Sequence, residues 1–274
     1  MPYFETQDHT RLFYKDWGTG KPVVFVSSWS LGADMWDYQM LPLSNQGFRC
    51  IAFDRRGHGR SDDPGRGYDF DTLANDLSTL IDTLDLHDVT LVGHSMGSAE
   101  ITRYLSCYGV SRIARVAFVA PIRLVQPADG SEDFVNVGMD QAAQLMSMDR
   151  PRYMKEGTIK FFALGDQWPA PATFSQAMVD WAVQLILQAS FKAILECWYA
   201  MRDTDFTAEM SALSVPLLVI HGDKDYNAPL EFCGRRIAQT VPGSQLIVYE
   251  GAPHGIFLTD RDRLTQDLAA YIQG

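Results

Sequence analysis

The first residue type that could do chemistry is a serine in the pattern G-x-S-x-G, at residues 93–97. An apolar stretch before it, residues 89–92, predicts a buried strand, and a helix is predicted to begin just after Ser95. A sharp strand-to-helix turn projects the hydroxyl out of the sheet, and small flanking residues let the chain pass tightly. The helix N-terminus also directs a backbone N–H at a developing oxyanion. A serine N-cap is the alternative interpretation, but this context favours a nucleophile.

A base for this serine is predicted at His254. A serine hydroxyl is a poor nucleophile unless a base accepts its proton. Among the six histidines, His254 lies in a loop directly after the predicted strand 245–249. Active sites form in loops at the carboxyl ends of parallel strands. The competing interpretation is an exposed loop histidine with no catalytic role.

An acid that orients the base is predicted in the turn after strand 217–220. Two aspartates, Asp223 and Asp225, stand there in the sequence H-G-D-K-D. Asp223 could instead brace the loop by accepting backbone N–H groups. Either aspartate gives the chain order Ser, Asp, His, and the residues alone leave the choice open.

Two backbone N–H groups are candidates for an oxyanion hole. One donor is the residue after the nucleophile, Met96, and the other comes from the loop after an early strand. The predicted strand 23–26 is followed by residues 27–32, so the second candidate is the amide of Trp29. The Trp29 side chain could in addition make a core or cap contact.

These residues must be positioned by strands that alternate with helices. Short apolar runs predict strands, and leucines at helical spacing predict a helix at 71–86. The predicted strands are 11–16, 23–26, 49–53, 89–92, 115–120, 217–220 and 245–249, and further helices are predicted at about 96–108 and from about 261. This alternation indicates βαβ units, and therefore an α/β fold with a mostly parallel sheet flanked by helices.

The segment 121–210 differs, because it contains helix-like stretches and no clear strand. We therefore predict a core made of residues 1–120 and 211–274, interrupted by a helical cap, residues 121–210. A loop is predicted at 168–171. Seven of the 11 methionines lie in this insertion, which suits an adaptable apolar pocket over Ser95. For any single one of these residues, packing within the cap is the alternative.

The composition excludes several classes of protein. The 274 residues are 46% hydrophobic and 21% charged, which rules out a disordered chain. No apolar run approaches the roughly 18 residues of a membrane span, and the first residues contain no secretory signal. We therefore expect a cytoplasmic protein with no membrane partner.

Charge and cysteine usage narrow the partners further. The net charge of −11 repels phosphate backbones, so nucleic-acid binding is not expected. The four cysteines are far apart and form no C-x-x-C pair, so neither a metal site nor a disulfide framework is indicated. The expected partner is a small molecule.

Motifs spread over nearly the whole chain carry a family resemblance. They are Y-K-D-W-G at 14–18, A-D-M-W-D-Y-Q-M at 33–40, A-F-D-R-R-G-H-G-R-S at 52–61, T-L-V-G-H-S-M-G at 90–97, V-I-H-G-D-K-D at 219–225 and A-P-H-G at 252–255. In these motifs the chain resembles the α/β-hydrolases. More narrowly, it resembles the bacterial arylesterases and cofactor-free perhydrolases that are also called non-haem chloroperoxidases.

The resemblance implies the α/β-hydrolase fold and a catalytic triad of Ser95, Asp225 and His254, and so selects Asp225 as the acid. It implies no metal and no organic cofactor. It assigns no catalytic role to Arg55, Arg56 or His58. Members of the group often self-associate, so a homo-oligomer stays open.

The expected reaction is hydrolysis of a small-to-medium, largely apolar carboxylic ester. The predicted pocket residues are Ser28, Phe134, Phe162, Trp198, Asn227 and Ala228. The main alternative is a hydrolase of lactones, including acyl-homoserine lactones, with the same triad. A ligand receptor that retains the triad is a second alternative. Haloalkane dehalogenases are disfavoured, because that family has an aspartate where this chain has Ser95.

Two departures from the group's pattern concern the oxyanion loop. Members usually carry His-Gly before the tryptophan, whereas this chain has Ser27 and Ser28. The change restricts backbone torsions and removes a polar support, so the loop is expected to be shaped differently. Efficient peracid formers often have proline directly after the tryptophan. This chain has Ser30, and we expect hydrolysis to dominate over perhydrolysis.

Overall fold

One mixed sheet forms the centre of the molecule. The computed structural model describes residues 2–127, 132–164 and 174–274, without the side chains of 132–136. Within these ranges eight strands pair in the order β1-β2-β4-β3-β5-β6-β7-β8. The first two pairings, β1 with β2 and β2 with β4, are antiparallel, and all the others are parallel. The predicted α/β class with a mostly parallel sheet is therefore confirmed.

The elements follow the alternation that the sequence predicted. The strands are β1 Tyr3–Glu5, β2 Arg11–Trp17, β3 Pro22–Val26, β4 Arg49–Phe53, β5 Val89–His94, β6 Ile113–Val119, β7 Leu217–Gly222 and β8 Gln245–Tyr249. The helices are η1 Ala33–Trp36 (a 3₁₀ turn), α1 Asp37–Asn45, α2 Phe70–Thr83, α3 Met96–Tyr108, α4 Glu132–Met148, α5 Arg150–Phe161, α6 Gln176–Leu187, α7 Phe191–Asp203, α8 Thr207–Ser211, α9 Gly234–Thr240, α10 Ile256–Thr259 and α11 Arg261–Gln273.

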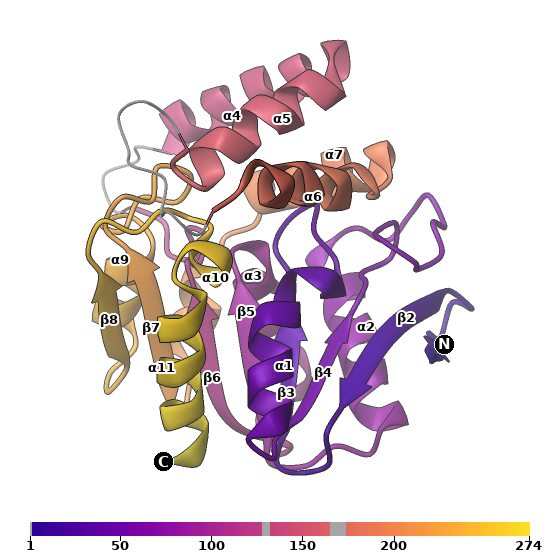
Figure 1. Ribbon diagram of the computed structural model, residues 1–274, viewed down its shortest axis with the longest axis vertical. Helices are drawn as coiled ribbons and strands as arrows, with labels where there is room; N and C mark the ends of the chain where they lie inside the picture. Colours follow the sequence, from indigo (N-terminus) through magenta and orange to yellow (C-terminus); the bar gives the residue numbers. More distant parts are fainter. Residues whose placement is uncertain (1, 128–131, 165–173) are drawn as a thin grey trace.

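Helices cover both faces of the sheet (Figure 1). One hydrophobic cluster joins one face to α2, α3, α8 and α9, and a second joins the other face to α1, α10 and α11. The central strand β5 is buried along its whole length, because it has helices on both sides. Such a strand holds its last residue rigidly, and that residue directly precedes Ser95.

Helices α4 to α7 lie together beyond the carboxyl ends of the parallel strands (Figure 1). They belong to the stretch between β6 and β7 in which no strand was predicted. The predicted loop at 168–171 lies outside the described residues. Apolar residues of α5 and α6 join the same cluster as α10 and α11, so these helices pack onto the core.

Helix α1 was not predicted, and its composition explains why. It contains Pro42, and its buried side chains are Gln39, Met40 and Leu43. The Gln39 amide donates to the carbonyl of Phe257 at 2.8 Å. A buried polar side chain interrupts the apolar periodicity that predicts a helix.

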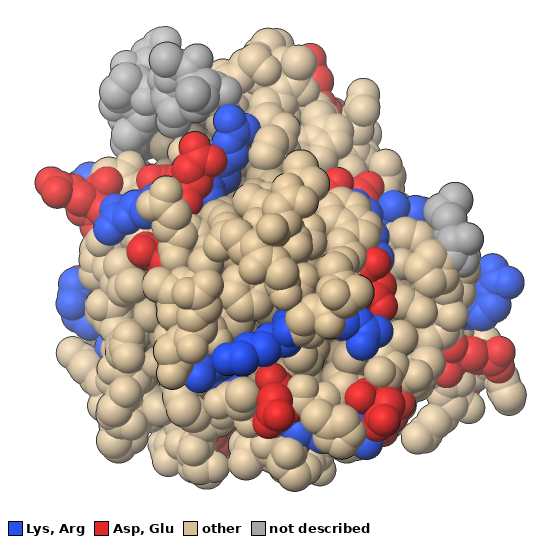
Figure 2. All heavy atoms as spheres, turned by 60° about the horizontal axis from the view of Figure 1, so that its bottom comes forward, with Lys and Arg blue, Asp and Glu red and all other residues tan. Residues whose placement is uncertain are grey.

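Two surface properties complete the description. Within the described ranges, no single helix has the length and apolar character of a membrane span; only α6 and α7 taken together, bent by 87°, meet those criteria. On the face in Figure 2, Lys and Arg are interspersed with Asp and Glu, and the described residues there form no extended basic area.

Candidate active site

Ser95 occupies a strained turn between β5 and α3. Its backbone has φ 53° and ψ −118°, a sparsely populated region that costs on the order of 1–3 kcal/mol. The two flanking glycines are required by close approaches: a Cβ on Gly93 would lie 2.8 Å from the Gly97 carbonyl, and one on Gly97 would lie 2.4 Å from the Val26 carbonyl oxygen. The turn therefore needs small residues on both sides, as the G-x-S-x-G pattern predicted.

A chain of hydrogen bonds connects Ser95, His254 and Asp225. The Ser95 Oγ donates to His254 Nε2 over 2.9 Å, and His254 Nδ1 donates to Asp225 Oδ2 over 2.6 Å. All three residues are at least 95% buried. They come from the ends of β5, β7 and β8, which are far apart in sequence but meet at one edge of the sheet.

The structure distinguishes the two aspartates that the residues alone left equivalent. Asp225 Oδ1 accepts the backbone N–H groups of Asn227 at 2.9 Å and Ala228 at 2.7 Å, which leaves Oδ2 for the histidine. Asp223 is exposed and accepts the Gly251 N–H at 2.7 Å, so it braces the loop between β8 and His254. Of these two aspartates, Asp225 is the one that contacts histidine rings, those of His221 and His254.

The environment of Asp225 keeps its carboxylate charged. Burial alone would raise its pKa, but the charge of His254 and hydrogen bonds from His221 and His254 outweigh burial and hold the pKa well below the ordinary value of 3.8. The Asp225 carboxylate is therefore ionised at neutral pH, in a position where it could stabilise a positive charge on the His254 ring.

His94 supports the loop of His254 from below. Its Nε2 donates to the His254 carbonyl oxygen over 2.9 Å, and the two ring centroids lie 4.9 Å apart. Complete burial, with the charge of His254 as a second cause, lowers the pKa of His94 to about 3. His94 is thus a neutral hydrogen-bond donor at physiological pH.

The backbone amides of Trp29 and Met96 are the two predicted oxyanion donors. Neither N–H has an acceptor within the described part of the chain. Met96 is the first residue of α3, where helical N–H groups have no intrahelical partner. Backbone N–H groups left open beside a nucleophile are what an oxyanion hole requires.

Arg55 holds the loop that carries the Trp29 amide. Its Nη2 donates to the Ser27 carbonyl at 2.9 Å and its Nη1 to the Ser28 carbonyl at 3.3 Å, while its Nε donates to Glu100 Oε1 at 2.6 Å. Arg55 and Glu100 are both essentially fully buried. Sequence reasoning assigned Arg55 no catalytic role, and none of its hydrogen bonds reaches a reacting atom. Arg55 instead positions the two serines that replace His-Gly.

The Trp29 side chain makes the cap contact that was considered as an alternative. Its indole N–H donates to the Ile194 carbonyl in α7 over 2.9 Å. Its ring lies 4.7 Å from that of Trp198, whose own N–H donates to the Met139 carbonyl in α4 over 2.8 Å. Trp29 therefore joins the oxyanion loop to α7 and, through Trp198, to α4.

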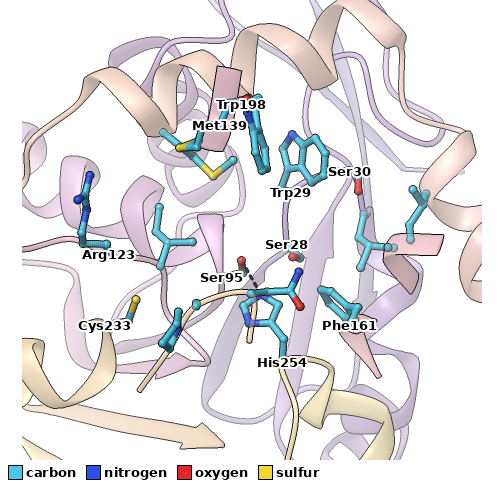
Figure 3. Close-up of a pocket in the computed structure, with 18 of the residues that line it drawn as sticks. Ser28, Trp29, Ser30, Ser95, Arg123, Met139, Phe161, Trp198, Cys233 and His254 are labelled. Atoms are coloured by element: carbon cyan, nitrogen blue, oxygen red, sulfur yellow. Dashed lines mark hydrogen bonds between the residues drawn. The ribbon is translucent and has the colours of Figure 1, made fainter. Parts of the chain in front are cut away.

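A cavity of about 810 Å³ opens above Ser95 (Figure 3). Ser95 and His254 lie in its floor, and helices α4 to α7 contribute mostly apolar residues. The side chains that line it include Ile122, Arg123, Met139, Tyr153, Met154, Thr158, Phe161, Ile186, Met201, Phe232, Cys233 and Arg236. Sequence reasoning missed these because no local pattern marks a residue that faces a cavity.

Four of the six predicted pocket residues line the cavity: Ser28, Trp198, Asn227 and Ala228. The Phe134 side chain lies outside the described residues. Phe162 does not line the cavity, because it packs beneath the His254 loop, where a Cβ on Gly255 would lie 2.2 Å from its ring. Its neighbour Phe161 faces the cavity instead, with its ring 4.9 Å from that of His254.

The described residues contain no group of three or more His, Cys, Asp or Glu that could hold a metal ion. The four cysteines are all free thiols, of which only Cys107 is exposed. Burial raises the pKa of both Cys50 and Cys197 to about 12. These two thiols are therefore not nucleophiles at neutral pH.

Several known proteins resemble this chain over nearly its whole length. A model of the alpha/beta hydrolase family matches residues 23–267. The non-heme chloroperoxidase CPO-A1 of Kitasatospora aureofaciens is 36% identical over 280 residues, which cover 99% of both chains. The bifunctional esterase/perhydrolase DCH of Acinetobacter calcoaceticus is 31% identical and matches over the whole of both chains. The crystal structure of a bromoperoxidase from Bacillus anthracis superposes with a TM-score of 0.91 at 33% identity, over 100% of both chains.

Proposed function

Because this chain belongs to the alpha/beta hydrolase family, among relatives of the non-heme chloroperoxidases, and is therefore a hydrolase, we propose that it cleaves carboxylic esters through an acyl-enzyme on Ser95. The observation that supports the proposal best is the buried chain from Ser95 Oγ through His254 to Asp225. Ser95 and His254 also line the cavity, together with Trp29, the residue of one candidate oxyanion donor.

The first half of the reaction forms the acyl-enzyme. The Ser95 Oγ attacks the ester carbonyl carbon while His254 Nε2 takes the hydroxyl proton. The carbonyl oxygen becomes an oxyanion, which accepts the Trp29 and Met96 N–H groups. Asp225 stabilises the imidazolium without taking its proton. As the C–O bond to the alcohol breaks, His254 returns that proton to the leaving oxygen.

The second half releases the acid. A water molecule enters the position of the departed alcohol, and His254 Nε2 accepts one of its protons as its oxygen attacks the acyl carbon. The same two N–H groups hold the second oxyanion. The bond to Ser95 Oγ then breaks, and the proton on His254 passes back to that oxygen.

The cavity indicates the size and character of the substrate. Its volume of about 810 Å³ lies within the usual range for a small-molecule site. Around the nucleophile the lining is aromatic and thioether-rich, with Phe161, Trp198 and Met139 contributed by the helices above. Methionine side chains adapt to ligands of different shape, so the preferred ester is small to medium in size and mainly apolar.

The test is initial-rate hydrolysis of p-nitrophenyl esters of increasing acyl length, together with simple lactones. We expect steady turnover of the esters, and loss of nearly all of it in Ser95→Ala. Ser211→Ala removes a hydroxyl from an exposed position in α8 and is the matched control, which should keep wild-type rates. Folded wild-type protein that turns over no ester contradicts the proposal. Lactone turnover in the absence of ester turnover would instead identify a lactone hydrolase.

A further inference from the structure

One side of the cavity is cationic. Two arginines line it from separate elements: Arg123 follows β6, and Arg236 lies on α9. Among the described residues that line the cavity, none is an aspartate or glutamate. The charge of these lining side chains is therefore opposite in sign to the net charge of the protein, which is −11. Apart from the histidine of the site, the two arginines are the titratable charged side chains among these described lining residues.

The guanidinium of Arg236 includes a donor nitrogen that lacks a hydrogen-bond acceptor among the described residues. Its Nη1 is buried and has no hydrogen-bond partner within the described residues. The guanidinium lies 6.0 Å from the ring centroid of Phe232, which also lines the cavity. A buried charged donor without an acceptor is more destabilising than a neutral one. A ligand with an anionic oxygen would supply the missing acceptor.

The buried thiol of Cys233 indicates where the two arginines act. Burial and the charge of Asp225 raise the pKa of this thiol, whereas the positive charges of Arg123 and Arg236 oppose the rise. Cys233 itself lines the cavity as the N-cap residue of α9, and Arg236 follows three residues later in that helix. In Figure 3, Cys233 and Arg123 lie on one side of Ser95 and His254, opposite Phe161 and Ser30. An extended substrate seated over Ser95 would reach from an apolar region to a cationic one.

We propose that Arg236 binds a carboxylate of the substrate, so that the preferred substrate is an ester or lactone carrying a carboxylate away from its scissile carbonyl. A planar guanidinium matches a carboxylate in shape and can donate two parallel hydrogen bonds. This inference rests on the proposed ester hydrolysis and refines it, because the rest of the substrate stays apolar.

The first experiment compares anionic esters with neutral esters of the same shape. On the acyl side the pair is mono-p-nitrophenyl glutarate and p-nitrophenyl 5-methylhexanoate. On the alcohol side it is 4-acetoxybenzoate and 4-isopropylphenyl acetate. We expect the wild type to prefer the anionic member of at least one pair by about tenfold or more in kcat/KM, since a charge-assisted hydrogen bond contributes on that scale.

Two variants assign the preference to Arg236. Arg236→Met keeps the length of the side chain and removes its charge, and should lower kcat/KM for the preferred anionic ester by about 10- to 100-fold. The neutral ester should stay within about twofold. The matched control is Arg235→Met, on the same helix: Arg235 pairs with Glu231 at 2.7 Å and does not line the cavity. This variant should keep the wild-type preference.

The outcomes separate this inference from the proposed function. Turnover of both esters at equal kcat/KM, or an equal loss on both in Arg236→Met, overturns the carboxylate site and leaves the ester hydrolase standing. If no ester is turned over, the hydrolase proposal fails. Calorimetric titration with glutarate then tests the site alone, and binding that disappears in Arg236→Met supports it. Inorganic phosphate binding as tightly as glutarate would overturn the assignment to a carboxylate.

Discussion

Asp225 is held between two histidines. Its Oδ2 accepts from His254, and the Nε2 of His221 lies 3.1 Å from the same oxygen and 2.7 Å from the Ala228 carbonyl. His221 is fully buried and stands against Gly234, where a Cβ would lie 2.5 Å from its Nδ1. A proton on His221 Nε2 therefore lies between both acceptors, and so fixes the carboxylate and its loop.

Replacing the two aspartates one at a time tests this arrangement. Asp225→Asn should lower kcat for ester hydrolysis by about 10⁴, since an amide favours the wrong histidine tautomer. Asp223→Asn, which changes only a loop contact, should stay within a few-fold of wild type. The measurement is kcat on one p-nitrophenyl ester. A similar loss in both variants would contradict the assignment of the acid.

The pH dependence of stability gives a second test of Asp225. Its pKa is depressed in the folded state, so its contribution to stability is fully present above the unfolded value of about 3.9. The contribution is lost as the pH falls through the lower folded pKa. When the pH is lowered below about 4, the free energy of unfolding of Asp225→Asn should therefore fall by less than that of the wild type. Urea unfolding at a series of pH values measures both. Parallel curves for the two proteins would contradict the depressed pKa.

Ser30 adopts a backbone conformation that proline cannot. Its φ is 62°, whereas proline is locked near −65°. Ser30→Pro should therefore displace the neighbouring Trp29 amide and lower esterase kcat by about tenfold or more. Ser30→Gly permits the observed angle and should retain activity, while relieving up to about 1–2 kcal/mol of strain. The measurements are kcat and urea unfolding. Wild-type kcat in the proline variant would show that this loop conformation is not needed.

At the scale of elements, one buried ion pair connects the two candidate oxyanion donors. Arg55 bonds the carbonyls of Ser27 and Ser28, just before Trp29, and Glu100 lies on the helix that begins at Met96. Burial raises the pKa of Glu100, although Arg55 opposes the rise. The pair therefore sets the distance between the β3 loop and α3, and with it the spacing of the two N–H groups.

Breaking this pair should affect stability and catalysis separately. Arg55→Met leaves a buried carboxylate unpaired and should lower the free energy of unfolding by about 3–5 kcal/mol. The double variant Arg55→Met/Glu100→Leu should recover much of that stability. Its kcat should stay low, because the Ser27 and Ser28 carbonyls remain unheld. Recovery of kcat together with stability would indicate a structural role only.

The elements that sequence reasoning predicted and those that it missed differ in a physical way. The predicted strands and the turn at Ser95 follow from local constraints, namely continuous burial and a backbone that only small neighbours permit. Helix α1 was missed because its buried face includes Gln39, whose partner Phe257 lies 218 residues further along the chain. Phe161 lines the cavity in place of the predicted Phe162, because Phe162 is the one that packs against Gly255. Long-range contacts of this kind leave no local pattern.

At the scale of the whole molecule, the core shields the thiols. Cys50, Cys197 and Cys233 are buried and only Cys107 is exposed. An aromatic disulfide reagent should therefore modify one thiol in the folded protein and four after denaturation. Cys107→Ser should abolish the first reaction and leave esterase kcat unchanged, because Cys107 does not line the cavity. Rapid modification of Cys50 or Cys197, the two buried thiols that do not line the cavity, would show that the core opens easily.

The bond from the Trp29 indole to α7 ends on a main-chain oxygen, the carbonyl of Ile194. Almost any amino acid at position 194 would present the same acceptor, so substitutions there can accumulate without breaking the link. A single inserted or deleted residue earlier in α7 is different, since it would rotate that carbonyl by about 100° around the helix axis. Among relatives that keep this tryptophan bond, we expect the exposed residues of α7 to vary while the number of residues up to this position stays constant.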